Sequence, residues 1–413
     1  MLYEDLEKIR KKNLDRMKIV RRITYTCGIN ISEPSFFKKF IVIHAFVVIF
    51  MSLLSIYGHI AYISEHFTSV FMISQSLCTC LQTLISIIKL FLWVFMERRF
   101  YKLVKATVDC ELFNEVKMLD INVTITKTLR EKTKKIIEDC WKRAQFQIRY
   151  YVVSCIAIIS FYFLNALAIN TYHSIKGNTN HTKLFAFSTY YPGWEEARQH
   201  FPLYPFFTIL DGYADFAAGM VAATFDGYYV FLTFHAVALF KTLKEMIIFS
   251  STNRVPKGEK MLYIRECVYH YNRCIRFCDE INDMYAIVNL SQLLISLVVL
   301  GVVLFQASIG LENDPKMFVN MVLYISAAGY ELVIYCFDGQ NITSETENIC
   351  DAWYSSNWYD ESREFKSIIY MMMMRTRKPY HISALGFTTM SRPTFLGIAK
   401  TSGSYFMLLR NVA

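Results

Sequence analysis

Long apolar stretches alternate with shorter charged stretches along this chain. A bilayer core about 30 Å thick needs roughly 20 apolar residues in a helix to cross it. Stretches of that kind occupy residues 40–63, 67–96, 148–169, 203–240, 285–309, 317–337 and 385–409. The pattern therefore predicts an all-α polytopic membrane protein with seven transmembrane helices.

Lysine and arginine are distributed unevenly between the segments that connect these spans. Segments 1–39, 97–147, 241–284 and 338–384 hold 10, 12, 8 and 5 of the 44 Lys and Arg residues. Segments 57–70, 170–205 and 308–316 and the end of the chain hold 0, 3, 1 and 1. Basic loops stay in the cytosol, so we expect a cytosolic N-terminus and an extracellular C-terminus. The net charge of +9 then reflects topology, and we expect no nucleic-acid partner.

Composition supports the membrane class, with 54% hydrophobic and 16% aromatic residues. All 11 cysteines fall in predicted cytosolic segments or spans, so we expect no extracellular disulfide framework. Among the Asn-x-Ser/Thr motifs, only Asn180 lies in a predicted outer loop, which makes it the expected glycosylation site. The charged first 39 residues lack the apolar core of a signal peptide.

We expect the chain to have four regions. Residues 1–39 form a cytosolic lead-in whose apolar residues recur at helical spacing, as in a helix that lies on the membrane surface. Residues 40–337 form a six-helix transmembrane bundle with an extracellular loop at 170–205. Residues 338–384 form a cytosolic anchor helix, in which Trp353, Tyr354 and Trp358 are predicted to make an interface. Residues 385–413 form the seventh transmembrane helix and tail.

Two predicted spans carry polar residues that a lipid-facing helix would lack. The second span reads Ser-Gln-Ser-Leu-Cys-Thr-Cys-Leu-Gln over residues 74–82, and the third contains Ser160 and Asn165 near its outer end. Buried polar groups in a membrane need partners. This face therefore meets either a neighbouring helix or a ligand cavity. The loop 170–205 is rich in aromatic residues and proline, and we expect it to fold back over the helix ends as a lid.

A cysteine and histidine pattern in the predicted cytosolic helix resembles zinc-ligand chemistry. Cys267, His270, Cys274 and Cys278 would share one helix face. Four ligands on one straight helix cannot surround a single ion, however. We therefore interpret these residues as a packed helix seam and expect neither a metal nor a cofactor.

The last predicted span is unusually polar. It contains Arg392, Lys400 and several small or hydroxylated residues, which a helix surrounded by lipid does not carry. Lys400 either faces water or pairs with Glu331 in the sixth span.

One side of that span changes from hydroxylated to apolar toward its extracellular end. Such a stripe is typical of an ion path whose apolar end closes by dewetting, although ordinary helix packing also produces it. The predicted pore and gate residues are Lys400, Thr401, Ser404, Tyr405, Leu408 and Val412.

Positions in about the last eighty residues form a signature. In the cytosolic helix they are Gly339, Ile342, Ser344, Ala352, Tyr354 and Trp358. Nearer the C-terminus they are Lys378, Pro379, Ala384, Gly386, Phe387, Ser391, Thr394, Phe395, Ile398, Lys400, Ser402, Ser404, Tyr405, Phe406, Leu408 and Leu409. These positions resemble the insect odorant receptor family, from which Gly403 and the pair Arg392 and Pro393 depart.

The resemblance implies a subunit of a heterotetramer with a shared co-receptor, opened directly by an odorant and conducting cations in the plasma membrane of a sensory neuron dendrite. It also implies a cytosolic intersubunit anchor, a pore lined by the last helix, and Leu408 as the gate. The co-receptor has a much longer second cytosolic loop than residues 241–284. This chain is therefore expected to be the odorant-tuning partner.

We place the odorant site in the outer half of the bundle, among the second, third, fourth and sixth spans and under the aromatic loop. An apolar, aromatic pocket with a few hydrogen-bonding groups suits a small volatile ester, alcohol or aldehyde. The candidate ligand-binding residues are Phe71, Gln75, Cys78, Ile158, Phe161, Tyr162, Asn165, Asp211, Tyr213, Phe216 and Tyr324.

Three other classes compete with this interpretation. A G-protein-coupled receptor has seven helices but requires an extracellular N-terminus, and its Asp/Glu-Arg-Tyr and Asn-Pro-x-x-Tyr motifs are absent from the expected places. A secondary transporter would show internal repeats. An enzyme would need a constellation of catalytic residues, which the sequence does not show, so we expect no enzymatic activity.

Overall fold

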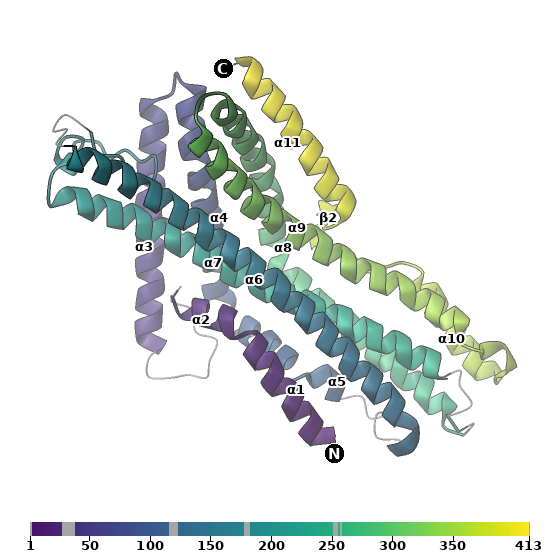
Figure 1. Ribbon diagram of the computed structural model, residues 1–413. Coiled ribbons are helices and arrows are strands. Elements are labelled where there is room, and N and C mark those ends of the chain that lie inside the picture. Colours follow the sequence, from purple (N-terminus) through teal and green to yellow (C-terminus); the bar gives the residue numbers. More distant parts are fainter. Residues whose placement is uncertain are drawn as a thin grey trace.

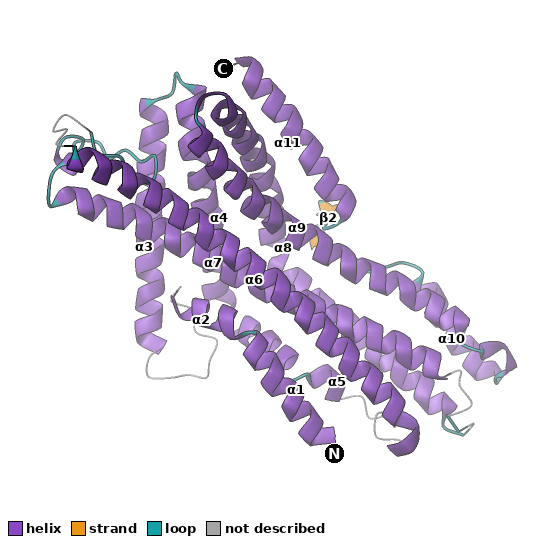
Figure 2. Cartoon of the chain, in the orientation of Figure 1, coloured by secondary structure: helices purple, strands orange, loops and turns teal. Residues whose placement is uncertain are grey.

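The computed structural model describes residues 2–26, 38–114, 123–176, 182–250, 255–256 and 258–412, which are almost entirely helical (Figure 2). Seven long helices contain or overlap the predicted spans. They are α3 (Lys38–Glu65), α4 (Val70–Val108), α6 (Val123–Ile175), α7 (Leu203–Ser250), α8 (Lys260–Asn313), α9 (Pro315–Ser355) and α11 (Arg392–Val412). The predicted all-α membrane-protein class is confirmed.

Shorter elements connect or flank these helices. The helical ones are α1 (Leu2–Arg16), α2 (Lys18–Thr26), α5 (Glu111–Asn114), η2 (Ala197–Gln199), η3 (Trp358–Asp360) and α10 (Arg363–Thr376). Strands β1 (Ser383–Ala384) and β2 (Thr388–Thr389) form a small antiparallel hairpin in which Ser383 lies opposite Thr389.

Five of the described helices are long and apolar enough to cross a bilayer: Ile43–Glu65, Val70–Val108, Lys127–Ile175, Lys260–Asn313 and Pro315–Ser355. Helix α7 falls outside this set because aspartate, glycine and tyrosine dilute its apolar residues. Helix α11 falls outside it because it carries Arg392, Lys400 and Arg410. Crossing by these two helices, and with it the count of seven, stays a prediction.

Helix α7 is the centre of the molecule. It packs against α3, α4, α6, α8 and α9, and it is buried along most of its length. Glycine permits the closest approach to α6, since a Cβ atom at Gly212 would lie 1.9 Å from the Phe163 ring. Helices α6 to α9 run side by side far beyond α3, and the two chain ends lie at opposite ends of the molecule (Figure 1).

The N-terminal region packs on the protein. Met17 and Val20 are fully buried, and Val20 fills the space beside Gly227 of α7. The Thr24 hydroxyl lies 3.3 Å from the Tyr228 hydroxyl. The apolar face of α2 therefore covers α7, and a position of this region on the membrane surface stays a prediction.

The connection into the last helix also differs from the prediction. In place of a single anchor helix over 338–384, α9 continues to Ser355 and is followed by η3, α10 and the hairpin. Leu385 and Gly386 have positive φ angles of 50° and 78°, which favour a tight turn and end any helix there. Helix α11 therefore begins at Arg392, with Pro393 in its first turn, where proline is tolerated.

Candidate functional site

A cavity of about 90 Å³ lies between α4, α6, α7 and α9. These four helices contain the second, third, fourth and sixth predicted spans, which are the ones expected to surround the ligand. Its lining residues are Thr79, Gln82, Thr83, Tyr151, Cys155, Ile158, Ile159, Tyr162, Phe187, Asp215, Ala218, Gly219, Ala222, Tyr324, Ala327, Ala328 and Glu331.

Small side chains keep this space open. Ala218, Gly219 and Ala222 lie along the lining of α7, and Ala327 and Ala328 do the same on α9. Larger residues at these positions would fill the space, since a Cβ atom at Gly219 would already lie 2.9 Å from the Cδ1 atom of Ile159. The sequence of α7 and α9 therefore creates the cavity by omitting side-chain volume.

The loop between α6 and α7 covers the cavity. The Phe187 ring lines it and stacks on Tyr162 with ring centroids 5.4 Å apart. The hydroxyls of Thr189 and Tyr191 each donate to Asp211 of α7 at 2.6 Å. The Tyr190 amide donates to the Gly58 carbonyl of α3 at 2.9 Å. These contacts confirm that the loop folds back onto the helix ends.

A buried arginine stabilises the inside of this loop. The Arg198 guanidinium donates to the Thr189 carbonyl at 2.8 Å and lies 3.7 Å from the centroid of the Phe185 ring. Burial lowers the pKa of Arg198, and the nearby negative charge of Asp211 opposes that shift. The arginine therefore holds the lid against α7 through hydrogen bonding, stacking and charge.

A buried ionic cluster borders the cavity on the side away from the loop. The Lys89 ammonium contacts Asp226 at 2.8 Å and Glu331 at 2.6 Å, and all three side chains are essentially inaccessible to solvent. The hydroxyls of Tyr151 and Tyr335 donate to Asp226. Charges removed from water persist only with such partners. The cluster links α4, α6, α7 and α9 at one point.

The cluster also decides whether Glu331 pairs with Lys400, which the sequence left open. Glu331 pairs with Lys89, whereas Lys400 is exposed on α11. Lys89 and Tyr151 were not among the predicted site residues. The available signal was the presence of one lysine and two acidic residues inside apolar spans, because such charges must find one another.

The predicted ligand-binding residues divide into two groups. Ile158, Tyr162 and Tyr324 line the cavity, and Cys78 lies behind it, where its carbonyl accepts the Tyr324 hydroxyl at 3.1 Å. Among the described residues, seven candidates do not line it: Phe71, Gln75, Phe161, Asn165, Asp211, Tyr213 and Phe216.

Specific contacts direct two of these seven residues elsewhere. Asp211 is used by the loop, and the Tyr213 hydroxyl lies 2.8 Å from Nε2 of His44 in α3. Thr79, Gln82, Asp215 and Phe187 replace them at the cavity. Helical periodicity alone does not distinguish a face that points into a cavity from one that meets a neighbouring helix. The polar residues of α4 do both, since Ser76 bonds to His59 and Ser74 to Gln306.

The cysteine and histidine seam lies in the core. Cys267, His270, Cys274 and Cys278 are all buried on α8. Within the described ranges, no group of three or more His, Cys, Asp or Glu side chains is arranged to hold a metal ion. Cys267, Cys274 and Cys278 belong to the main hydrophobic core, so this face of α8 contributes to packing.

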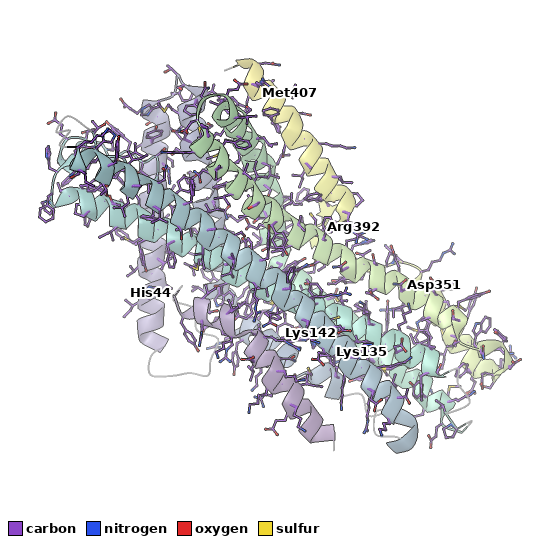
Figure 3. All side chains as sticks on the ribbon, in the orientation of Figure 1. His44, Lys135, Lys142, Asp351, Arg392 and Met407 are labelled. Carbon is purple, nitrogen blue, oxygen red and sulfur yellow. The ribbon has the colours of Figure 1, made fainter. Side chains whose placement is uncertain are left out.

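Helix α11 packs on α8 and α9 through one face and leaves the other uncovered (Figure 1). Ser402 is buried, and its hydroxyl donates to the Leu297 carbonyl of α8 at 2.9 Å. Thr401, Ser404, Tyr405 and Leu408 are exposed, the last at 59%. In Figure 3, Arg392 is labelled at the start of this helix and Met407 in its second half. Val412 ends α11.

The three predicted anchor residues differ in exposure. Trp353 is fully buried within the chain, so it belongs to the core of this subunit. Tyr354 is 69% exposed and Trp358 is partly buried. Only Tyr354 and part of Trp358 are therefore available to another molecule. The predicted glycosylation site, Asn180, lies outside the described residues.

A cavity between helices that is lined mainly by apolar and aromatic side chains, with a few polar groups, is the kind of site at which helical proteins bind small molecules. The family model described as "7tm Odorant receptor" matches residues 69–403. Odorant receptor 63a of Drosophila melanogaster is 32% identical over 417 residues, which cover 99% of this chain and 98% of the relative. The chain belongs to the odorant receptor family.

Other relatives agree with this assignment. Odorant receptor 67b of Drosophila melanogaster is 24% identical and covers 100% of this chain and 98% of the relative. The solved olfactory receptor OR5 from Machilis hrabei in complex with eugenol has the same fold, with a TM-score of 0.79, 16% identity and coverage of 99% and 100% of the two chains. The expected family, and the expectation of a tuning receptor that is not the co-receptor, are confirmed.

Proposed function

We propose that this chain is the odorant-binding subunit of a ligand-gated cation channel in which a small volatile molecule occupies the cavity between α4, α6, α7 and α9. The observation that carries the proposal is the cavity itself, covered by Phe187 and bordered by Glu331 of the ionic cluster. The OR5 structure with eugenol shows that a receptor of this fold binds a small aromatic volatile.

Through the ionic cluster, a ligand in the cavity can change the arrangement of the surrounding helices. A ligand that displaces Glu331 or Tyr151 changes the surroundings of Lys89 and Asp226, which belong to α4 and α7. Buried ion pairs tolerate few arrangements because each charge must keep a partner. Occupancy of the cavity therefore favours one relative placement of four helices over another, as gating requires.

The exposed face of α11 is the proposed pore surface. Thr401 and Ser404 supply hydroxyls for hydrating ions, and Leu408 supplies an apolar ring when several subunits meet around one axis. The pore is proposed to be shared with co-receptor subunits in a heterotetramer, with Tyr354 and Trp358 at the cytosolic anchor. Permeant cations and the bilayer are the remaining partners.

Family membership favours this channel over the alternative of a G-protein-coupled chemoreceptor. The two also differ in topology, because the channel requires a cytosolic N-terminus and an extracellular C-terminus. An epitope placed after Ala413 is expected to stain on intact cells, and Asn180 is expected to carry a glycan. Staining only after permeabilisation would contradict the proposed orientation.

The direct test is electrical. Cells that express this chain with a co-receptor are recorded during exposure to a panel of volatile esters, alcohols, aldehydes and amines, and cells with either chain alone serve as controls. We expect a rapid cation current that does not depend on G-protein signalling and that requires both chains. Currents abolished by inhibiting G-protein signalling would contradict the proposal.

A further inference from the structure

Two carboxylates line the cavity, and they differ in their partners. Glu331 contacts Lys89 at 2.6 Å, and the Gln82 amide donates to its second oxygen at 3.4 Å. Asp215 accepts a hydrogen bond from the Thr83 hydroxyl at 3.4 Å through Oδ1. Its other oxygen, Oδ2, is buried and has no hydrogen-bond partner in the described part of the chain. Asp215 therefore lines the cavity with a carboxylate that has one oxygen unsatisfied within the described residues.

The charges around Asp215 do not neutralise it. On its own helix, Asp211 lies one turn away and adds a second negative charge, which the loop engages through Thr189 and Tyr191. On α4 the cavity-lining neighbours are neutral, and on α9 the charge of Glu331 is already taken by Lys89. Across residues 2–26, 38–114, 123–176, 182–250, 255–256 and 258–412, Asp215 makes no ion pair.

A carboxylate in such a place needs a partner. Burying an ionised carboxylate without a counter-charge or full hydrogen bonding is strongly unfavourable. The terminal torsion of aspartate is soft, so the group can turn either oxygen toward the cavity. A ligand that brings a positive charge and N–H donors would meet both requirements.

The size of the cavity limits the rest of the ligand. An apolar cavity of about 150 Å³ accommodates one benzene molecule, and this cavity measures about 90 Å³. By the same ratio, a ligand of roughly three to five non-hydrogen atoms fits without rearrangement. Its hydrocarbon part would contact Ile158, Ala218 and Ala222.

We propose that this cavity selects small aliphatic amines, whose ammonium group pairs with Asp215 while the hydrocarbon part packs against the alanine and isoleucine side chains. The inference rests on the proposed odorant-binding function of the cavity. Alkylamines have pKa values close to that of lysine, about 10.4, and are cations at neutral pH. Esters and alcohols of the same size lack the charge, so they leave Asp215 unpaired.

The test compares ligands of equal size on the full channel. Cells that express this chain with a co-receptor are exposed to butylamine, 1-butanol and methyl acetate, which have equal numbers of non-hydrogen atoms, in buffer of fixed pH. We expect half-maximal activation by butylamine at a concentration about tenfold or more below that of the neutral ligands. Asp215→Asn should raise the half-maximal concentration of butylamine about tenfold. It should change the half-maximal concentration of 1-butanol less than about threefold.

Two further variants separate recognition from folding. Asp215→Glu keeps the charge and should retain the preference for butylamine. Asp211→Asn removes an acid on the same helix whose oxygens contact the loop, so it should shift all three ligands alike. Surface biotinylation checks that each variant reaches the membrane, and the neutral ligands report on channel function.

The remaining outcomes are decisive. Equal potency of butylamine and 1-butanol on the unmodified channel would overturn the inference, as would an equal loss for all ligands in Asp215→Asn. If Asp215→Asn lost only the response to methyl acetate, Asp215 would be protonated and would donate to the ester carbonyl. That result would also overturn the inference. Responses to neutral ligands alone reject the amine preference but keep the proposed function. Silence toward every volatile rejects both.

Discussion

The buried ionic cluster and the outer face of α11 treat polar groups in opposite ways. In the cluster, Lys89 contacts both Asp226 and Glu331, and tyrosine hydroxyls satisfy Asp226 further. On α11, Lys400, Thr401 and Ser404 are exposed, although this helix lies beside the same bundle. The charges of the first region are paired in the protein interior, whereas the polar side chains of the second lie open at the surface.

The difference shows where this subunit depends on other molecules. Polar groups in a bilayer core require partners or water. The charged groups of the cluster are paired with one another within this chain, so the cluster stabilises the isolated subunit. The hydroxyls of Thr401 and Ser404 donate to the Gly397 and Lys400 carbonyls of their own helix, and the exposed face of α11 would meet neighbouring subunits and water in its proposed role as a pore surface.

The largest expected effect comes from breaking the cluster. Lys89→Met leaves two carboxylates buried without a cation, and we expect a loss of about 3–5 kcal/mol in the free energy of unfolding. Thermal unfolding of the purified protein in detergent measures this loss. Lys400→Met is the matched control, and its effect should stay within about 0.5 kcal/mol because Lys400 is exposed. Equal melting temperatures for both variants would remove the distinction between the two regions.

The anchor provides a second contrast between buried and exposed residues. Trp353→Ala should destabilise the subunit by about 3–5 kcal/mol, because it empties a fully buried site. Tyr354→Ala should change stability by less than about 0.5 kcal/mol yet reduce co-purification with the co-receptor, since this side chain faces outward. Undiminished co-purification of the Tyr354 variant would show that the anchor contacts lie elsewhere.

The α11 face can be tested without altering stability. Leu408→Ser should raise the current in the absence of ligand by about tenfold, because a hydroxyl hydrates the proposed apolar gate. Met407→Ser is the control, since Met407 is similarly exposed but lies off the predicted stripe. Whole-cell recordings with the co-receptor give both values. A larger leak from the Met407 variant would assign the pore to a different face of α11.

The smallest effect is expected inside the cavity. Tyr162→Phe removes one hydroxyl from the lining, and the half-maximal concentration of an agonist should change about three- to tenfold, as for the loss of one hydrogen bond. Tyr213→Phe should change it less, because its hydroxyl bonds to His44 outside the cavity. Dose-response curves of the two variants decide between the cavity and a site nearer α3.

The long helices and the four helices around the cavity follow from the sequence pattern, whereas the cavity lining includes only some of the predicted ligand-binding residues. Ile158, Tyr162 and Tyr324 line the cavity, whereas Asp211 and Tyr213 do not. A polar residue on a buried face satisfies the same sequence pattern whether its partner is a loop, a helix or a ligand. The partner of Asp211 lies in a loop about 20 residues away along the chain, and periodicity carries no information about that contact.

What the sequence by itself determined is the membrane class, the helical elements and the family signature near the C-terminus. These follow from local properties, since the length of an apolar run and the spacing of residues along it do not depend on other segments. The tertiary structure alone decided that Lys89 serves Glu331, that α2 covers α7, and that Asp215 keeps an unsatisfied oxygen beside a small cavity. Each of these three features depends on which helices pack together and in what register. Contacts between segments that are distant in the sequence determine this packing.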